Sequence, residues 1–118
     1  MATASPAYKI LLVDDDADIL ELLEYNLLKE NFLLAKAMNG KEAIAVAKSF
    51  QPHLIIMDVM MPEMDGIDTA RAVRDWERSK NLDPCTIVAL TAHATREFEQ
   101  RCRSVGMNDF LAKPFTME

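Results

Sequence analysis

Several features that define other classes of protein are scarce or absent in this sequence. It contains three glycines and two cysteines, and no apolar run is long enough to span a lipid bilayer. The cysteines, Cys85 and Cys102, lack the spacing of a metal-binding motif, and each falls in an apolar segment where a thiol packs as a small hydrophobic group. We therefore expect no membrane-spanning segment, no zinc site and no disulfide scaffold.

Positive charge is also in deficit, because 13 lysines and arginines stand against 19 aspartates and glutamates and leave a net charge of −6. A surface of that sign repels the phosphate backbone, so direct binding of nucleic acid is disfavoured. Residues 1–7 have neither a basic start nor an apolar stretch, which is typical of a flexible tail and not of a signal peptide. We expect a cytoplasmic protein with no membrane contact.

Length and pattern predict one folded unit. A chain of 118 residues suits a single compact domain, which we place at 8–118. Short β-type runs alternate with segments of helical period, and this alternation indicates a mostly parallel α/β sheet. The five predicted strands are 9–13, 32–37, 53–57, 86–90 and 109–112.

Helices are expected between these strands, the last two over residues 67–78 and 95–105. Asp16 or Asp18 can cap the first helix, and Asn39 followed by Glu42 resembles a capping box at the start of the second. The predicted fold class is α/β, a doubly wound five-stranded parallel sheet, for which we expect the flavodoxin-like strand order 2-1-3-4-5.

Polar side chains follow four of the five predicted strands at the points where the strands end. Asp14 and Asp15 follow the first strand, Asp58 the third, Thr91 the fourth and Lys113 the fifth. In open α/β sheets the functional crevice lies beyond the carboxyl ends of the strands. Because strands one and three are neighbours in the expected order, we predict that three carboxylates converge there.

Converging carboxylates repel one another. Two of them about 4 Å apart cost roughly 4 kcal/mol at an effective dielectric constant near 20, so the cluster needs a cation or protons. A site of hard oxygen ligands suits Mg²⁺, which is usually held by one or two carboxylates together with phosphate oxygens. We therefore predict a Mg²⁺ site at Asp14, Asp15 and Asp58 that a phosphate-bearing ligand completes.

Phosphoryl transfer is the chemistry that fits these residues. Asp58 ends the most apolar and therefore most central strand, which makes it the candidate nucleophile. Lys113 and Thr91 would contact the phosphoryl group as a cation and a hydroxyl donor. Each residue has a structural alternative: Asp14 and Asp15 as helix-capping acids, Asp58 as a turn residue, and Lys113 as a solvated lysine.

Three other features are interpreted as structural. Asp65 with Gly66 indicates a turn followed by a helix start. His53 begins an apolar strand, and His93, although close to the predicted site in sequence, fits a histidine at a helix start better than a ligand.

Four segments together resemble the receiver domain of two-component response regulators. They are ILLVDDD at 10–16, LIIMDVMMPEMDG at 54–66, VALTA at 88–92 and LAKPF at 111–115. Their order and spacing span nearly the whole chain, so the resemblance is specific. It implies a signalling domain that catalyses only its own phosphorylation and dephosphorylation. The phosphoryl group would come from a histidine kinase or histidine phosphotransfer protein, and a downstream output domain or protein would respond.

The resemblance also implies roles for individual residues around the metal. Asp58 accepts the phosphoryl group, and Mg²⁺ binds Asp15, Asp58 and the backbone carbonyl of Met60. Asp14 assists through water. The implied ligand set therefore adds one carbonyl to the three carboxylates.

On the other side of the phosphoryl group, the resemblance implies contacts from Thr91 and Lys113. It further implies that Phe110, in the last strand, turns inward as a switch when those contacts form. The Lys113–Pro114 bond is typically cis in such domains, which proline permits. In such a domain, signalling consists of a phosphorylation-dependent shift in the populations of two conformers.

The end of the chain departs from the family pattern. Relatives continue past residues 111–115 into a fifth helix, whereas residues 116–118 provide barely a first turn. We therefore expect the fifth helix to be largely missing, and the sheet face left uncovered would favour a dimer.

The resemblance is also mixed, because residues 9–66 look like receivers of winged-helix transcription regulators and residues 85–115 look like those of hybrid sensor kinases.

The sequence has three alternative interpretations of function. A flavodoxin-type binding domain is disfavoured because three aspartates in the loop after the first strand would repel a flavin phosphate. A phosphohydrolase should have a second acid two residues after Asp58, where Met60 stands instead. A receiver-like protein-interaction domain that signals without phosphorylation remains the main alternative.

Overall fold

The computed structural model describes residues 8–59, 65–91 and 95–112 of the chain. The predicted tail at 1–7 and residues 116–118 lie outside this described part. Within it, strands and helices alternate as β1 (Lys9–Val13), α1 (Ala17–Leu28), β2 (Leu33–Ala37), α2 (Gly40–Phe50), β3 (Leu54–Asp58), α3 (Gly66–Ser79), β4 (Thr86–Thr91), α4 (Arg96–Ser104) and β5 (Asp109–Ala112). The predicted α/β class is confirmed.

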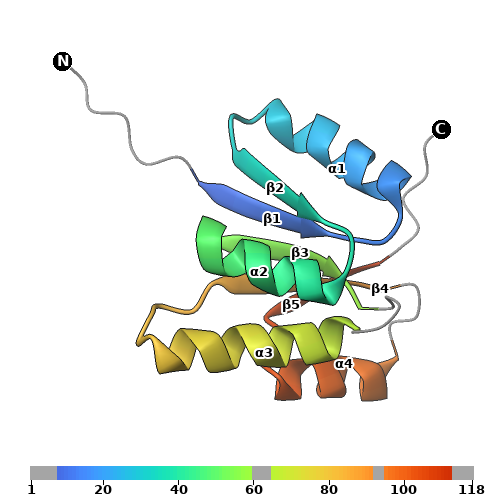
Figure 1. Cartoon of the computed structure of the whole chain (residues 1–118). Helices are drawn as coiled ribbons and strands as arrows, with labels where there is room; N and C mark the ends of the chain where they lie inside the picture. Colours follow the sequence, from blue (N-terminus) through green and yellow to red (C-terminus); the bar gives the residue numbers. More distant parts are fainter. Residues whose placement is uncertain (1–7, 60–64, 92–94, 113–118) are drawn as a thin grey trace.

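The five strands form one parallel sheet in the order β2-β1-β3-β4-β5, as predicted. Ile55 of the central strand β3 pairs with Leu11 of β1 on one side and with Ile87 of β4 on the other. Because every pairing is parallel, all five strands end at the same edge of the sheet, where the arrowheads point in Figure 1.

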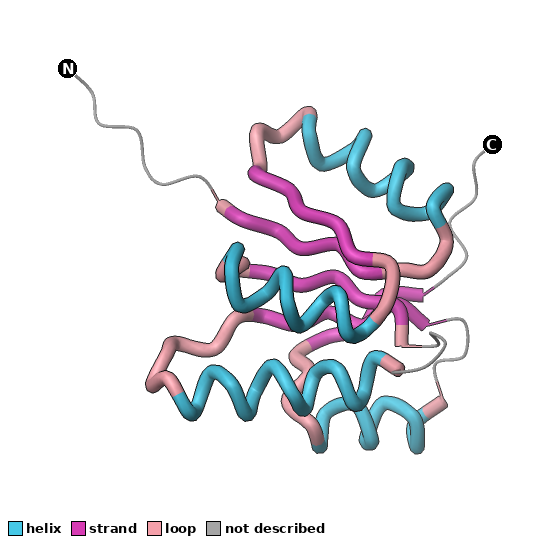
Figure 2. Tube along the Cα trace, viewed as in Figure 1, coloured by secondary structure: helices cyan, strands magenta, loops and turns pink. Residues whose placement is uncertain are grey.

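Helices cover the two faces of the sheet unequally. In the described residues, α1 lies on one face, whereas α2, α3 and α4 lie together on the other, as Figures 1 and 2 show. Side chains alternate between faces along a strand, so each strand contributes to two cores. Leu11 and Ile55 join the core under α2–α4, and Leu12 and Ile56 join the core under α1. Of the helices described, none combines the length and the apolar character that crossing a membrane requires.

Each described helix begins at a short polar side chain that accepts a hydrogen bond from the first turn. The N-caps are Asp16, Asn39, Asp65 and Thr95. Asp16, and not Asp18, therefore caps α1. At α2 the capping box is only half formed, because the Glu42 carboxylate accepts from the Met38 N–H at 3.3 Å and not from the N–H of Asn39. These caps satisfy backbone donors that a helix start leaves unpaired.

Four strand boundaries differ from the predictions by one residue each: β2 and β3 begin one residue later, and β3 and β4 end one residue later, which places two site residues within the sheet. β3 runs to Asp58 and β4 to Thr91 because the hydrogen-bonded ladder continues to their carboxyl ends. At its other end β3 begins one residue later than expected. There His53 accepts a hydrogen bond at Nδ1 from the Lys9 N–H at 2.9 Å and stacks on the Tyr8 ring. The structural interpretation of His53 is confirmed.

A buried ion pair that sequence reasoning missed ties α3 to the amino-terminal end of β4. The Arg74 guanidinium donates to the Glu77 carboxylate at 2.7 Å, and both residues are less than 10% exposed. Glu77 accepts a second hydrogen bond from the Cys85 N–H at 2.7 Å, and Arg74 also donates to the Gly106 carbonyl at 2.8 Å. Arg74 and Glu77 follow the inward stripe of Ala70 and Val73, and this continuation was the available signal.

The two cysteines are free thiols, as predicted. Burial raises the pKa of the Cys85 thiol to about 12, with the Glu77 carboxylate adding to the rise and Arg74 opposing it. Burial also raises the pKa of Cys102.

The thiolate is the reactive form of cysteine, so we expect iodoacetamide to alkylate both cysteines slowly in the native protein at mildly alkaline pH and rapidly in guanidinium. Peptide mass mapping after timed alkylation checks this, and rapid native labelling of Cys85 would contradict it.

Candidate functional site

Three acidic side chains come together at the carboxyl edge of the sheet. Asp14 directly follows β1, and Asp58 is the last residue of the neighbouring strand β3, where Val13 pairs with Met57. Carboxylate oxygens of Asp14, Asp15 and Asp58 lie within 4.8 Å of one another. The convergence expected from the strand order is therefore observed.

The three carboxylates differ in their exposure. Asp14 is fully buried and Asp58 is 4% exposed, whereas Asp15 is exposed. The Asp14 N–H donates to the Ala37 carbonyl of β2 at 3.1 Å, and Asp14 Oδ1 accepts from the Asp16 N–H at 2.9 Å. Asp14 therefore also supports the turn that leads into α1, a structural role close to the helix-capping role considered as its alternative. Two of the carboxylates are therefore buried, and the third faces solvent.

The start of α3 is packed against the backbone at Asp58. The Gly66 N–H donates to the Val59 carbonyl at 3.1 Å. A Cβ atom at Gly66 would lie 2.7 Å from the Cα of Val59 and 2.9 Å from the carbonyl oxygen of Asp58, so only glycine allows this approach. Asp65 accepts from the Asp68 N–H as the N-cap, which confirms the expected turn and helix start. The end of β3 is therefore held on several sides.

Thr91 and Phe110 lie on the two strands beyond Asp58. Asp58 pairs with Leu90 of β4, so the next residue, Thr91, lies at the same edge of the sheet and is buried. Phe110 of β5 pairs with Ala89 and is half-buried, with the Arg103 guanidinium 4.8 Å above its ring. The topology thus places the predicted hydroxyl donor beside the strand that carries Asp58.

Three residues with predicted roles lie outside the described part of the chain. They are Met60, His93 and Lys113. Their assignments stay predictions, as does the cis form of the Lys113–Pro114 bond.

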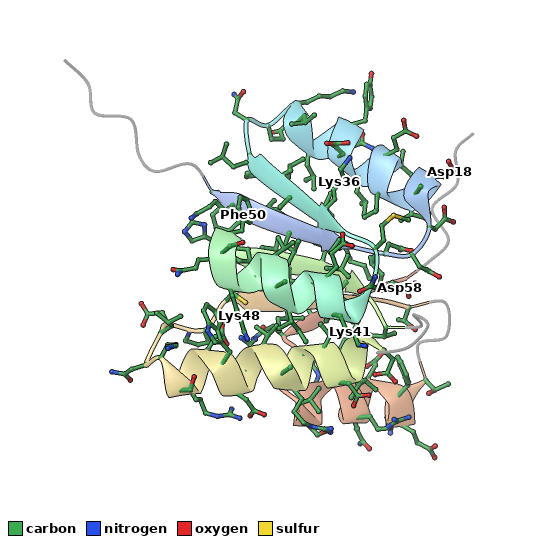
Figure 3. All side chains as sticks on the ribbon, in the orientation of Figure 1. Asp18, Lys36, Lys41, Lys48, Phe50 and Asp58 are labelled. Carbon is green, nitrogen blue, oxygen red and sulfur yellow. The ribbon has the colours of Figure 1, made fainter. Side chains whose placement is uncertain are left out.

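The donor set of the acidic cluster fits a hard divalent cation. It consists of carboxylate oxygens alone, which suit Mg²⁺ better than softer metals that prefer sulfur or imidazole. A cation also offsets the repulsion among carboxylates at this separation. In Figure 3, Asp58 lies at the carboxyl edge of the sheet, whereas Lys48 and Phe50 lie toward the opposite end. The residues present therefore fit a magnesium site at this edge.

Comparison with known proteins gives a consistent result. Residues 10–118 match the family model described as the response regulator receiver domain. The chain is 40% identical over 114 residues to the hybrid signal transduction histidine kinase B of Dictyostelium discoideum, covering 90% of this chain and 6% of that protein. It thus corresponds to a small part of that relative.

Solved structures show the same fold. The chemotaxis protein CheY4 of Vibrio cholerae aligns with a TM-score of 0.86 at 32% identity, covering 94% of this chain and 90% of that one. The receiver domain of the Saccharomyces cerevisiae response regulator Ssk1, crystallised with the histidine phosphotransfer protein Ypd1, aligns with a TM-score of 0.88 at 31% identity, covering 98% and 84%.

Proposed function

This chain belongs to the response regulator receiver domain family, and we propose that it is a phosphoacceptor switch in which Asp58 receives the phosphoryl group. Receiver domains of this family are signalling domains of two-component systems. The observation that carries the proposal is the convergence of Asp14, Asp15 and Asp58 at the carboxyl edge of the sheet. A receiver that worked by binding alone would have no need of this costly cluster.

Asp58 is the nucleophile in this proposal because of its position. It is the last residue of the central strand, and its pairing with β4 and the close approach of the start of α3 restrict its backbone. A fixed carboxylate loses little orientational freedom on reaching the transition state. Asp15 is exposed, and Asp14 lies beyond the end of β1, so neither is placed within a strand as Asp58 is.

In this proposal Asp15, Asp58 and the Met60 carbonyl would hold Mg²⁺, and Asp14 would assist through water. When bound, the ion neutralises negative charge on the phosphoryl oxygens and on the carboxylates themselves. The all-oxygen donor set supports this assignment.

In the proposed transfer, one Asp58 carboxylate oxygen forms a bond to phosphorus as the bond from phosphorus to the donor breaks. The donor is a phosphohistidine nitrogen of a kinase or phosphotransfer protein, and its electron pair returns to the imidazole. The Thr91 hydroxyl donates a hydrogen bond to the incoming phosphoryl group, and Lys113 supplies positive charge. The chain catalyses only this transfer and the later hydrolysis of its own acyl phosphate.

Partners and location follow from the same proposal. Relatives include a hybrid signal transduction histidine kinase, and the receiver domain of Ssk1 was crystallised with a histidine phosphotransfer protein. We place this chain in the cytoplasm between such a donor and a downstream output domain or protein, with Phe110 as the switch that reports phosphorylation. Neither nucleic acid nor membrane is a direct partner in this proposal, and a dimer is its proposed assembly.

Acetyl phosphate provides the direct test. Incubation with acetyl phosphate and Mg²⁺ should add one phosphoryl group to the chain, seen as a single mass increment by intact-protein mass spectrometry. Chelation of Mg²⁺ should prevent the addition, since the carboxylate cluster then repels the anionic donor. A folded chain that stays unmodified in saturating Mg²⁺ would overturn the proposal and favour a domain that signals by binding alone.

A further inference from the structure

A groove rich in arginine lies between α3, from its middle to its carboxyl-terminal end, and the end of α4. It is a hollow of about 460 Å³, and four of its eight lining residues are arginines, whereas one, Asp75, is acidic. Figures 1 and 2 show α3 and α4 side by side on the same face of the sheet. On a chain whose net charge is −6, this concentration of positive charge needs an explanation.

Helical spacing produces the groove. Arg71, Arg74 and Arg78 are three and four residues apart on α3, so they form one stripe along the helix. Arg103 reaches the same hollow from the last turn of α4. A cation in the last turn stabilises a helix terminus, which accounts for Arg78 and Arg103 individually. It does not account for Arg71, which lies in the first half of α3.

Arg74 forms the floor of the groove and does not provide free charge. Its guanidinium is paired with Glu77 and donates from Nε and Nη2 to the Gly106 carbonyl at 3.1 Å and 2.8 Å. Gly106 has a φ of 96°, and a Cβ atom there would lie 2.9 Å from the Arg74 Nε. The floor is therefore rigid, and the outer arginines surround a preformed hollow.

The three outer arginines can exchange their present partners at little cost. Arg71 is 3.5 Å from Asp68, and Arg78 is paired with Asp75, and both pairs are exposed. Exposed ion pairs of this kind contribute only about 0–1 kcal/mol. Within the described residues, Arg103 has no carboxylate at ion-pair distance; it donates to the Asn108 carbonyl at 3.2 Å and lies over the Phe110 ring.

We propose that this groove is a docking site for a short acidic segment of a partner protein, whose carboxylates pair with Arg71, Arg78 and Arg103. Guanidinium groups form two parallel hydrogen bonds with a carboxylate, which gives the pairing both strength and geometry. A nucleic acid suits the groove less well, because a long polyanion would also meet the acidic remainder of the surface. A segment confined to the groove avoids that repulsion.

Arg103 gives this docking a distinctive signature. In this proposal the Arg103 guanidinium, whose Cζ lies 4.8 Å from the centre of the Phe110 ring, moves off that ring to pair with a carboxylate in the groove. Exposed cation–π contacts contribute about 0.5–1 kcal/mol, so removing the ring should tighten peptide binding about twofold to fivefold. An effect of net charge alone would not depend on the Phe110 ring.

Fluorescence anisotropy with fluorescein-labelled octaglutamate tests the docking site on the whole chain. Arg78→Gln/Arg103→Gln should weaken binding about tenfold. The matched pair Arg96→Gln/Arg101→Gln removes the same amount of positive charge from α4 outside the groove and should have little effect. Phe110→Leu should tighten binding. Arg71→Gln/Arg78→Gln serves as a second variant pair, since it leaves the contacts of Arg103 intact, and circular dichroism verifies folding.

Several outcomes would overturn the docking site. One is the absence of octaglutamate binding to the wild-type chain at low salt. Another is equal weakening by the groove pair and the matched pair, which would reduce the effect to net charge. Binding of single-stranded DNA or of phosphatidylserine vesicles as tight as that of octaglutamate would assign the arginines to a different class of partner.

Discussion

Asp58→Asn should abolish the incorporation of a phosphoryl group from acetyl phosphate, because the amide lacks a nucleophilic carboxylate oxygen. The substitution keeps the shape of the side chain, so the hydrogen-bonded end of β3 should persist. Intact-protein mass spectrometry should show the modified mass in the wild type and not in the variant. A phosphoryl group that still appears on Asp58→Asn would move the acceptor to another residue.

Asp15→Asn is the matched control, because it removes the same charge from the same cluster. It should slow phosphorylation without abolishing it, and a higher Mg²⁺ concentration should restore part of the rate. Mg²⁺ at 100 times its dissociation constant stabilises a protein by about 2.7 kcal/mol, so urea unfolding with and without Mg²⁺ gives a separate readout. We expect that stabilisation in the wild type and less of it in both variants.

Glu77→Ala should lower the free energy of unfolding by about 3–5 kcal/mol, the usual cost of leaving one member of a buried ion pair without its partner. The Arg74 guanidinium would remain buried, and the Cys85 N–H would lose its acceptor. Urea denaturation followed by circular dichroism measures the change. The exposed pair of Arg78 and Asp75 on the same helix provides the control, and Asp75→Ala should cost less than about 1 kcal/mol.

Replacing both members of the buried pair distinguishes lost charge pairing from lost packing. Arg74→Met/Glu77→Leu should recover much of the stability lost in Glu77→Ala, because apolar side chains of similar volume need no compensating charge. A double variant as unstable as Glu77→Ala would show that the hydrogen bonds to the Gly106 carbonyl and the Cys85 N–H carry the stability instead.

Prediction from sequence succeeded where local patterns carry the information. The run from Leu54 to Met57 is apolar throughout, so it indicated a central strand covered on both faces. Asn39 and Asp65 were expected at helix starts and are N-caps in the structure. The ends of strands were predicted less accurately. The pairing that extends β4 to Thr91 is with Ala112 of the neighbouring strand β5, which is distant in sequence.

Prediction was weakest where a side chain's partner is distant in sequence. Arg74 lies over 30 residues from the Gly106 carbonyl and the Asn108 side chain that it contacts, and its charge alone favoured an exposed position. Gly66 was expected to serve a turn. The structure shows a stricter requirement, because the start of α3 lies so close to the backbone at Asp58 that no Cβ atom fits at Gly66.

The sequence by itself determined the alternation of strands and helices and the placing of Asp14, Asp15, Asp58 and Thr91 at strand ends, because these depend on local periodicity and on residue type. Only the tertiary structure decided that the three carboxylates meet within 4.8 Å and that four arginines share one groove. Both arrangements depend on which elements lie side by side, and that order is set by packing across the whole sheet.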